Sequence, residues 1–329
     1  MTKKIAFILL ALIGFSATSC VNREKNKTEN NQLIIFHAGS LSVPFKQMKE
    51  QFEKENPEVE ILLESAGSVQ CARKIIDLKK DCDIMASADY SIIDQMLIPE
   101  YADWNIHFAT NEMTIVFHDA SKFANEINSQ NWFDILLRDD VIYGRSDPNS
   151  DPCGYRTLLT AQLAEKYYNQ PDLTEKLKAK NQEYIRPKEV DLLALLESNS
   201  IDYIFLYRSV AQQHGLKYIL LPDSVNLKLP ELNEFYQTAS VEIIGSKPGE
   251  KLMQTGQAMV YGITILKNAP NKELAEKFLK FVLDDNGGRK ILENNGQPAL
   301  KQTIPEQLNK IPSNIKILLN RYFFLKNAL

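Results

Sequence analysis

The chain has 329 residues, of which 44% are hydrophobic and 24% are charged, and its formal net charge is −4. This length exceeds what one hydrophobic core usually holds and suits two lobes of roughly 100–150 residues each. The mildly acidic balance, with no dense run of lysine and arginine, argues against nucleic-acid binding, because neutralising phosphates requires clustered cations. If the ligand is an anion, local geometry must attract it.

The first twenty residues have the anatomy of an export signal. Two lysines precede an apolar run over residues 5–15, and small residues follow up to Cys20. The run is shorter than the roughly 20 residues that span a bilayer, so we expect residues 1–19 to be a signal peptide. Cys20 resembles the lipobox cysteine of bacterial lipoproteins and predicts a lipid anchor, although Ala17 stands where that motif usually has Leu. An ordinary signal peptide with an incidental cysteine is the alternative.

The segment after the signal is polar. Residues 20–32 are rich in Asn, Lys and Glu without apolar periodicity, which predicts a flexible tether. Beyond it the chain has three cysteines, Cys71, Cys82 and Cys153. The odd number and the absence of a CxxC pair argue against a zinc site. Cys71 and Cys82 could form a disulfide or could remain two free thiols, because small buried thiols are also common.

The first part of the folded region alternates strand and helix patterns. Residues 33–36 form an apolar run of strand length, and 44–52 have apolar residues at helical spacing. A second strand is predicted over 58–63, a helix over 68–76 and a third strand over 83–89. Strand, helix, strand, helix, strand is the order of a parallel α/β sheet.

The remainder continues the pattern. Further strands are predicted over 113–118, 141–144, 202–207 and 258–265. Further helices are predicted over 154–168, 189–198, 209–215, 272–283 and 289–294.

Two Gly-Ser pairs stand where predicted strands end and helices begin. They are Gly39-Ser40 and Gly67-Ser68. In parallel α/β sheets, ligands bind at the carboxyl ends of the strands, and free N–H groups at a helix start attract anions. Serine adds a donor hydroxyl. Each pair taken alone could equally be a structural cap and turn.

Three motifs carry a resemblance to a known family. They are Phe36-His-Ala-Gly-Ser-Leu41, Asp147-Pro-Asn-Ser-Asp-Pro-Cys-Gly-Tyr-Arg156 and Val260-Tyr-Gly-Ile-Thr-Ile265. Together they resemble the tungstate/molybdate-binding proteins of bacterial and archaeal ABC importers, over about residues 33–300. The middle motif is the most specific of the three and the Gly-Ser pairs are the least specific.

The resemblance implies an α/β, two-lobed periplasmic-binding-protein-like (type II) fold. Each lobe would be a mixed sheet flanked by helices, with the ligand in the cleft between the lobes. Lobe I would comprise residues 33–112 and 240–329, and lobe II residues 113–239. We expect no cofactor and a monomeric chain.

The resemblance also implies a set of ligand-binding residues. They are Ser40, Leu41, Ser68, Asp151, Pro152, Cys153, Glu242 and Tyr261. Serine and tyrosine hydroxyls and backbone N–H groups would hold the oxo groups, while Asp151 and Glu242 would bond to the metal centre. Hexavalent molybdenum and tungsten are hard, electron-poor centres that favour oxygen ligands, so two carboxylates raise four oxo ligands to six-coordinate. Sulfur in sulfate cannot expand in this way, which gives a basis for discrimination.

Local readings of the same residues remain open. Asp151 followed by proline is also the pattern of a helix N-cap, and Asp147 shares the same Ser-Asp-Pro context. Glu242 lies in a strand-like pattern whose period could place it in solvent. Tyr261 could be a core residue with its hydroxyl bonded internally.

Other functions are weighed against this one. The chain lacks the nucleophile-elbow, Walker, zinc-protease and dinucleotide motifs, so we do not expect an enzyme. A sulfate or phosphate binder would use donors alone. A ferric-iron binder would use paired tyrosines, but Tyr167 and Tyr168 are adjacent on a predicted helix and face different directions. A surface scaffold lipoprotein is the last alternative. An importer would require a permease and an ATPase as separate chains.

Overall fold

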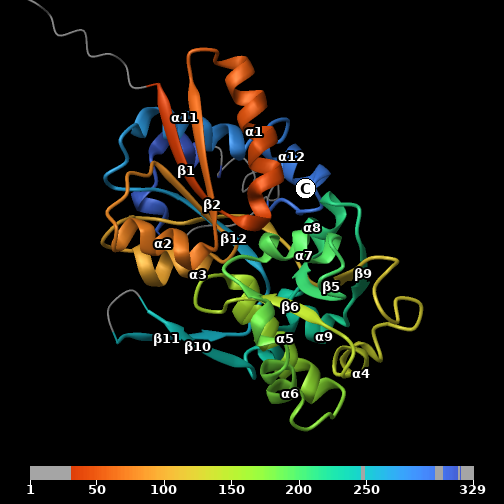
Figure 1. Ribbon diagram of the computed structural model, residues 1–329. Helices are drawn as coiled ribbons and strands as arrows, with labels where there is room; N and C mark the ends of the chain where they lie inside the picture. The colour runs from red at the N-terminus through yellow and green to blue at the C-terminus, as the bar shows by residue number, and fades with distance from the viewer. Residues whose placement is uncertain (1–30, 246–248, 301–306, 318, 320–329) are drawn as a thin grey trace, which may run out of the picture. The chain divides into compact units, whose positions relative to one another are not determined.

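Two five-stranded mixed sheets organise the chain in a computed structural model that describes residues 31–245, 249–300, 307–317 and 319 (Figure 1). The signal peptide, Cys20 and most of the predicted tether lie outside these residues. We call the part built on the first sheet lobe I and the part built on the second sheet lobe II. Within the described residues, no helix combines the length and apolar character needed to cross a membrane.

Lobe I has the strand order β2-β1-β3-β12-β4. Its strands are β1 (Gln32–Ala38), β2 (Glu60–Ala66), β3 (Ile84–Ser87), β4 (Ile106–Thr110) and β12 (Val260–Ile265). β1 pairs parallel with β2 and β3, whereas β12 runs antiparallel to β3 and β4. Its helical elements are η1 (Gly39–Leu41), α1 (Ser42–Glu55), α2 (Ser68–Ile76), α3 (Tyr90–Ile92), η2 (Ile93–Leu97), α11 (Lys272–Val282) and α12 (Gly288–Asn294).

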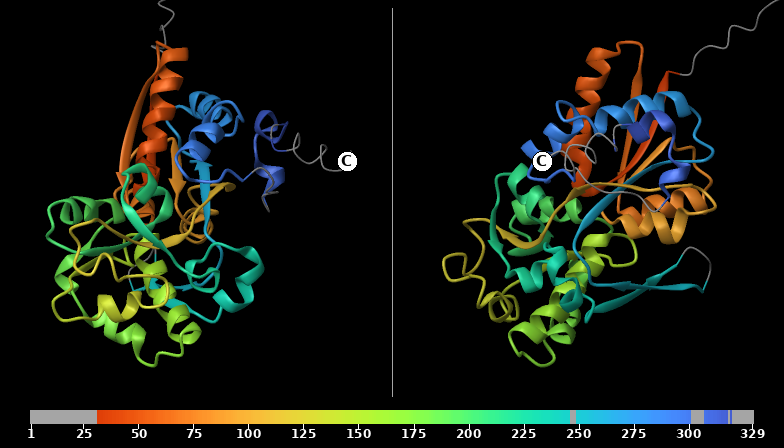
Figure 2. Two further views of the ribbon diagram at one scale, coloured as in Figure 1. Left: turned by 90° about the vertical axis from the view of Figure 1, so that its right-hand side faces the viewer. Right: turned by 180° about the vertical axis from the view of Figure 1, so that it is seen from behind.

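The N-terminal and C-terminal parts of the chain build lobe I together. Figure 2 shows the blue C-terminal helices lying with the red and orange N-terminal elements. The apolar stripe of α1 explains why: Phe45, Met48 and Phe52 are buried at helical spacing. Phe52 packs edge-on against Phe278 of α11, with ring centroids 5.2 Å apart. Aromatic burial of this kind stabilises the packing of α11 on α1.

Lobe II has the strand order β7-β6-β8-β5-β9. Its strands are β5 (Met113–Phe117), β6 (Tyr143–Ser146), β7 (Ile185–Arg186), β8 (Tyr203–Tyr207) and β9 (Lys217–Leu220). β6 is parallel to β7 and β8, and β5 is antiparallel to β8 and β9. Its helices are α4 (Trp132–Leu136), α5 (Pro152–Tyr167), α6 (Leu173–Ala179), η3 (Gln182–Tyr184), η4 (Glu189–Leu192), α7 (Leu193–Glu197), α8 (Arg208–Gln213), α9 (Asp223–Asn226), η5 (Pro230–Leu232) and α10 (Asn233–Tyr236).

The chain passes between the lobes twice. The first crossing is the short step from β4 to β5, and the second is the long return that leads to β12. On this return, β10 (Ser240–Ile244) and β11 (Lys251–Thr255) form a separate antiparallel hairpin. The hairpin packs on α5 of lobe II, where Gln162 and Ser240 exchange two hydrogen bonds of 2.9 Å.

The two-lobed mixed-sheet architecture predicted from the sequence is confirmed. The boundaries 33–112 with 240–329, and 113–239, stay a prediction, and the hairpin β10–β11 contacts lobe II although it falls in the range assigned to lobe I. Cys71 and Cys82 are both buried free thiols in this structure.

Candidate functional site

Both Gly-Ser loops of lobe I contact lobe II at very short range. Gly39 opens η1 directly after β1, and Gly67 is the N-cap of α2 directly after β2. A Cβ on Gly39 would lie 2.8 Å from Oε2 of Glu189, and a Cβ on Gly67 would lie 2.1 Å from the carbonyl oxygen of Ser150. The backbone N–H of Gln70 also donates to that carbonyl at 3.1 Å. The glycines are therefore required because the two lobes approach each other at these loops.

Ser40 is buried and forms part of a short hydroxyl chain. Its Oγ lies 3.0 Å from Oη of Tyr261 on β12, and Asn111 Nδ2 donates to the same Oη at 2.9 Å. Because Tyr261 accepts from Asn111, its own proton can go to Ser40, which leaves the Ser40 proton for another acceptor. Burial raises the pKa of Tyr261 above its ordinary value, which keeps this phenol protonated.

Ser68 has a comparable arrangement at the start of α2. It is fully buried, and its Oγ accepts from the backbone N–H of Ala88 at 3.0 Å. With the oxygen accepting, the hydroxyl proton is available to an acceptor elsewhere. The two serines that the sequence indicated are thus both oriented as donors by a neighbour that donates to them.

Asp151 lies on lobe II where the Gly67 loop meets it. It is the N-cap of α5, with Oδ1 accepting from the Cys153 N–H at 3.3 Å and Oδ2 accepting from the Glu189 N–H at 3.1 Å. Pro152 occupies the first helical turn, as the sequence pattern indicates. The carboxyl group is completely buried, and this burial raises its pKa. Asp151 is therefore both a cap and an interlobe residue.

Asp147 has a different role in the same loop. Its carboxylate accepts from the Asn149 N–H and the Ser150 hydroxyl, both at 2.9 Å, which closes the turn that leads into α5. Asp151, rather than Asp147, thus lies against the loops of lobe I.

Glu189 completes the site and was not among the residues predicted from the sequence. It opens η4 and its side chain is fully buried, where the groups that act on its pKa include the adjacent Asp151 carboxyl, through a side-chain hydrogen bond, and the backbone N–H of Ser40. Burial, and next the negative charge of Asp151, raises the pKa of Glu189 well above its usual range. Within the described part of the chain, no lysine or arginine forms an ion pair with Asp151 or Glu189. In the sequence, Glu189 is visible only as an acid at the start of a predicted helix, directly after Arg-Pro-Lys. That pattern indicates an ordinary helix start and does not mark a binding residue.

Glu242, in contrast, is not brought to this site. It lies on β10, where Val241 and Ile243 are buried and the alternate side chains are exposed. Its side chain is 49% exposed and forms an ion pair with Lys251 at 2.6 Å. The period-2 alternation of the strand places Glu242 in solvent, away from Asp151 and the two Gly-Ser loops, and its predicted role as second carboxylate stays a prediction.

The arrangement suits an unusual ligand. Two adjacent buried carboxyls without a cation are expensive. Ser146, on the strand that precedes this loop, adds a buried hydroxyl that interacts with Asp151. Strongly perturbed acids at such a position indicate a functional site. Donor hydroxyls on one side and carboxyls on the other fit a species with peripheral oxygens and an electron-poor centre.

Comparisons with known proteins identify the family of this chain. A family model for bacterial extracellular solute-binding proteins matches residues 33–297. The chain is 48% identical over 287 residues to an uncharacterised solute-binding protein of Petrotoga mobilis, covering 87% of this chain and 89% of that protein. It is 42% identical over 335 residues to the molybdate/tungstate-binding protein WtpA of Thermococcus kodakarensis, covering 92% and 94%.

Two solved structures share the fold at low sequence identity. The periplasmic molybdate-binding protein of Azotobacter vinelandii aligns with a TM-score of 0.58 and 16% identity, covering 80% of this chain and 98% of that one. The sulfate-binding protein SubI of Mycobacterium tuberculosis aligns with a TM-score of 0.59 and 13% identity, covering 82% and 87%. The chain therefore belongs to the bacterial extracellular solute-binding proteins, the class that serves ABC importers, and molybdate/tungstate-binding proteins are among its relatives.

Proposed function

We propose that this protein captures molybdate or tungstate between its lobes and delivers the anion to an ABC permease, whose ATPase is a separate chain. The relatives named as molybdate/tungstate-binding proteins support the ligand class. The carrying observation is the buried carboxyl pair of Asp151 and Glu189, because two acids lie against each other and no lysine or arginine among the described residues forms an ion pair with them.

The proposed binding mode uses these carboxyls as ligands to the metal centre. Ionised carboxylates repel the oxo groups of a fully deprotonated tetrahedral anion, and this repulsion is offset if the carboxylates bond to the central atom. Hexavalent molybdenum and tungsten accept such bonds, and two of them complete six oxygen ligands. We therefore propose Asp151 and Glu189 as the metal-directed pair, with Glu189 in the place that the sequence analysis assigned to Glu242.

The peripheral contacts would come from donors on both lobes. The Ser40 and Ser68 hydroxyls, each with its oxygen already accepting or shared, would donate to oxo groups. The backbone N–H of Leu41 would supplement them at a helix start, where the backbone favours anions, and the Cys153 N–H would do so by sharing or exchanging its bond to Asp151 Oδ1. Tyr261 would act through Ser40, whose hydroxyl it orients.

Calorimetric titration with tungstate, molybdate and sulfate tests the function. Wild-type protein is expected to bind both group-6 anions and to prefer them strongly over sulfate. Glu189→Gln is expected to lower tungstate affinity by about 100-fold, roughly 3 kcal/mol, whereas Glu242→Gln leaves it unchanged. Equal affinity for sulfate would reduce the proposal to a general oxyanion receptor, and loss of binding in Glu242→Gln alone would restore that residue as the ligand.

Export as a lipoprotein is the remaining part of the proposal. The support is the N-terminal pattern of two lysines, an apolar run and Cys20 after small residues. Mass spectrometry of the membrane fraction should find an acylated Cys20, and Cys20→Ser should release the protein in soluble form. An unmodified cysteine in membrane-free wild-type protein would contradict the anchor.

A further inference from the structure

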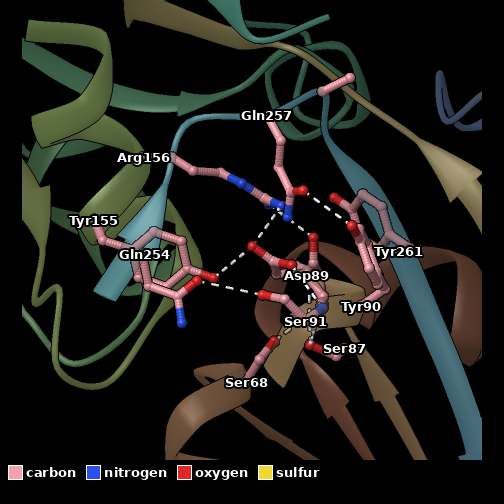
Figure 3. Close-up of polar contacts among 12 residues, drawn as sticks. Ser68, Ser87, Asp89, Tyr90, Ser91, Tyr155, Arg156, Gln254, Gln257 and Tyr261 are labelled. Carbon is pink, nitrogen blue, oxygen red and sulfur yellow. Dashed lines mark hydrogen bonds and ion pairs between the residues drawn. The ribbon is translucent and has the colours of Figure 1, made fainter. Parts of the chain in front are cut away.

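A third buried acid, Asp89, lies between the lobes, and unlike the carboxyl pair it is paired with a cation. Asp89 follows β3 in lobe I, and Arg156 is on α5 in lobe II. Arg156 Nη2 and Asp89 Oδ2 are 3.1 Å apart, and the two side chains are only 2% and 4% exposed. Figure 3 shows Arg156 and Tyr155 reaching from α5 toward Asp89.

Both lobes supply hydrogen-bond partners to this ion pair. Tyr155 Oη donates to Asp89 Oδ2 at 2.7 Å, and the Ser91 N–H donates to Oδ1 at 2.9 Å. Arg156 Nη1 donates to the Ala88 carbonyl at 2.7 Å and to Tyr207 Oη at 3.1 Å. Pulling the lobes apart at this point would strand a guanidinium on one lobe and a carboxylate on the other, so the set is complete only when the lobes meet as they do here.

The ion pair is connected to the ligand site by the backbone of one residue. Ala88 offers its carbonyl to Arg156, and its N–H donates to Ser68 Oγ at 3.0 Å. Arg156 is also in the second turn of the helix that Asp151 caps. The pair thus ties the Ser68 loop to the start of α5 without either charge belonging to the carboxyl pair.

A buried ion pair has an energy suited to reversible contact. Its mutual attraction is largely offset by the loss of hydration of two charges, so its net stabilisation is small when it forms. An apolar contact of the same area would gain more and would resist reopening. Each charge of the pair can replace its partner by water when the lobes separate. The ion pair therefore favours a contact between the lobes that forms and breaks readily.

We propose that the Asp89–Arg156 pair is an interlobe latch, and that Arg156 is a positioning residue that sets how long the lobes remain closed around the bound anion. The latch holds the closed arrangement in place, and its loss lets the lobes separate more often. The inference rests on the proposed function for the identity of the anion, but the lobe contact itself does not depend on it.

Interlobe distance and binding kinetics test the latch separately. Spin labels on Asn169 in lobe II and Lys54 in lobe I allow double electron–electron resonance on the ligand-free protein, and stopped-flow fluorescence measures tungstate association and dissociation. Arg156→Gln and Asp89→Asn are expected to broaden the distance distribution toward longer separations. They should also raise the tungstate dissociation rate about tenfold, with the association rate changed less than twofold.

Two further variants keep the test decisive. Tyr155→Phe removes a single hydrogen bond to Asp89 and should shift both readouts in the same direction by a smaller amount, even if the charge variants fold poorly. Arg289→Gln removes a buried arginine inside lobe I, 3% exposed and bonded to Asp285, and should leave both readouts as in wild type.

The outcomes separate the latch from the function. Unchanged distances and dissociation rates in folded Arg156→Gln and Tyr155→Phe would overturn the latch. Failure of the wild type to bind tungstate would overturn the proposed ligand, while the ligand-free distances would still decide the latch.

Discussion

The two acidic clusters where the lobes meet differ in how their charges are matched. Asp89 is paired with Arg156 and also accepts from Tyr155 and the Ser91 N–H. Glu189 is equally buried, but it lies beside a second carboxyl, and no lysine or arginine among the described residues forms an ion pair with either acid. A folded protein retains adjacent buried acids without a cation only where something compensates for them. We take the cation-paired acid to belong to the protein's own architecture and propose that the pair without a cation belongs to the ligand site.

The largest expected effect comes from making the same acid-to-amide change in both clusters. Asp89→Asn should lower the free energy of unfolding of the ligand-free protein by about 3–5 kcal/mol, because it leaves the Arg156 charge buried without a partner. Glu189→Gln should instead leave stability unchanged or raise it by about 1 kcal/mol at pH 8, because a neutral amide replaces an unpaired carboxyl. Urea unfolding monitored by circular dichroism measures both. Equal losses would erase the distinction between the clusters.

A smaller effect is expected from filling the space between the lobes. Gly67 has φ −61° and ψ 143°, which any residue adopts, so Gly67→Ala acts only through the Cβ that would meet the Ser150 carbonyl. We expect tungstate affinity to fall about 10- to 100-fold, or roughly 1.4–2.7 kcal/mol, because the lobes cannot approach fully.

Gly288→Ala is the matched control for this substitution. Its Cβ would lie 2.5 Å from Val282 Cα, entirely inside lobe I. It should lower the melting temperature and leave the affinity of the folded protein as it was. Wild-type affinity in Gly67→Ala would show that the lobes need not approach so closely to bind.

The smallest effect is a pH dependence that distinguishes the clusters. Burial raises the pKa of Asp151 and Glu189 above their ordinary values, so the folded ligand-free protein holds protons that the unfolded chain has released. Their contribution to stability is therefore complete below the ordinary carboxyl pKa and is lost as pH rises through the raised values, by at most about 1.4 kcal/mol per pH unit and proton. Tungstate affinity should rise with pH over the same window, because metal-directed carboxylates must be deprotonated.

Glu189→Gln should flatten both profiles, since one titrating group is gone. Chemical unfolding and calorimetry between pH 5 and 9 provide the measurement. A wild-type affinity that is independent of pH would contradict a proton-linked carboxyl pair.

Much of the fold could be predicted because its signals are local. The apolar spacing of Phe45, Met48 and Phe52 predicts α1, and the strand–helix alternation predicts β1 to β3. The hairpin β10–β11 was not predicted as a separate sheet, because only the alternation of Val241 and Ile243 marks it and its position depends on packing against α5. The predicted helix over 189–198 is two consecutive shorter elements, η4 and α7. At its start, the Glu189 N–H donates to Asp151 Oδ2.

The site was predictable only where a motif carries it. Asp151 is visible as an acid before proline at a helix start, and Ser40 and Ser68 follow strand ends. Glu189 has no such local mark, because its role comes from a contact with a residue 38 positions earlier in the chain. Glu242 was chosen because the family resemblance implied a second carboxylate, while its strand pattern alone left open which face is buried.

The close approach of Gly67 to Ser150 has a consequence for how such a receptor can evolve. Main-chain atoms, not side chains, set the spacing between the lobes there, with the Gln70 N–H bonded to the Ser150 carbonyl. Substitutions at other positions alter side chains and leave this main-chain contact in place, whereas any side chain at Gly67 would push the lobes apart. If the anion binds as proposed, we expect its preferred size to change through Gly67 or through a loop insertion or deletion, and not through the surrounding side chains.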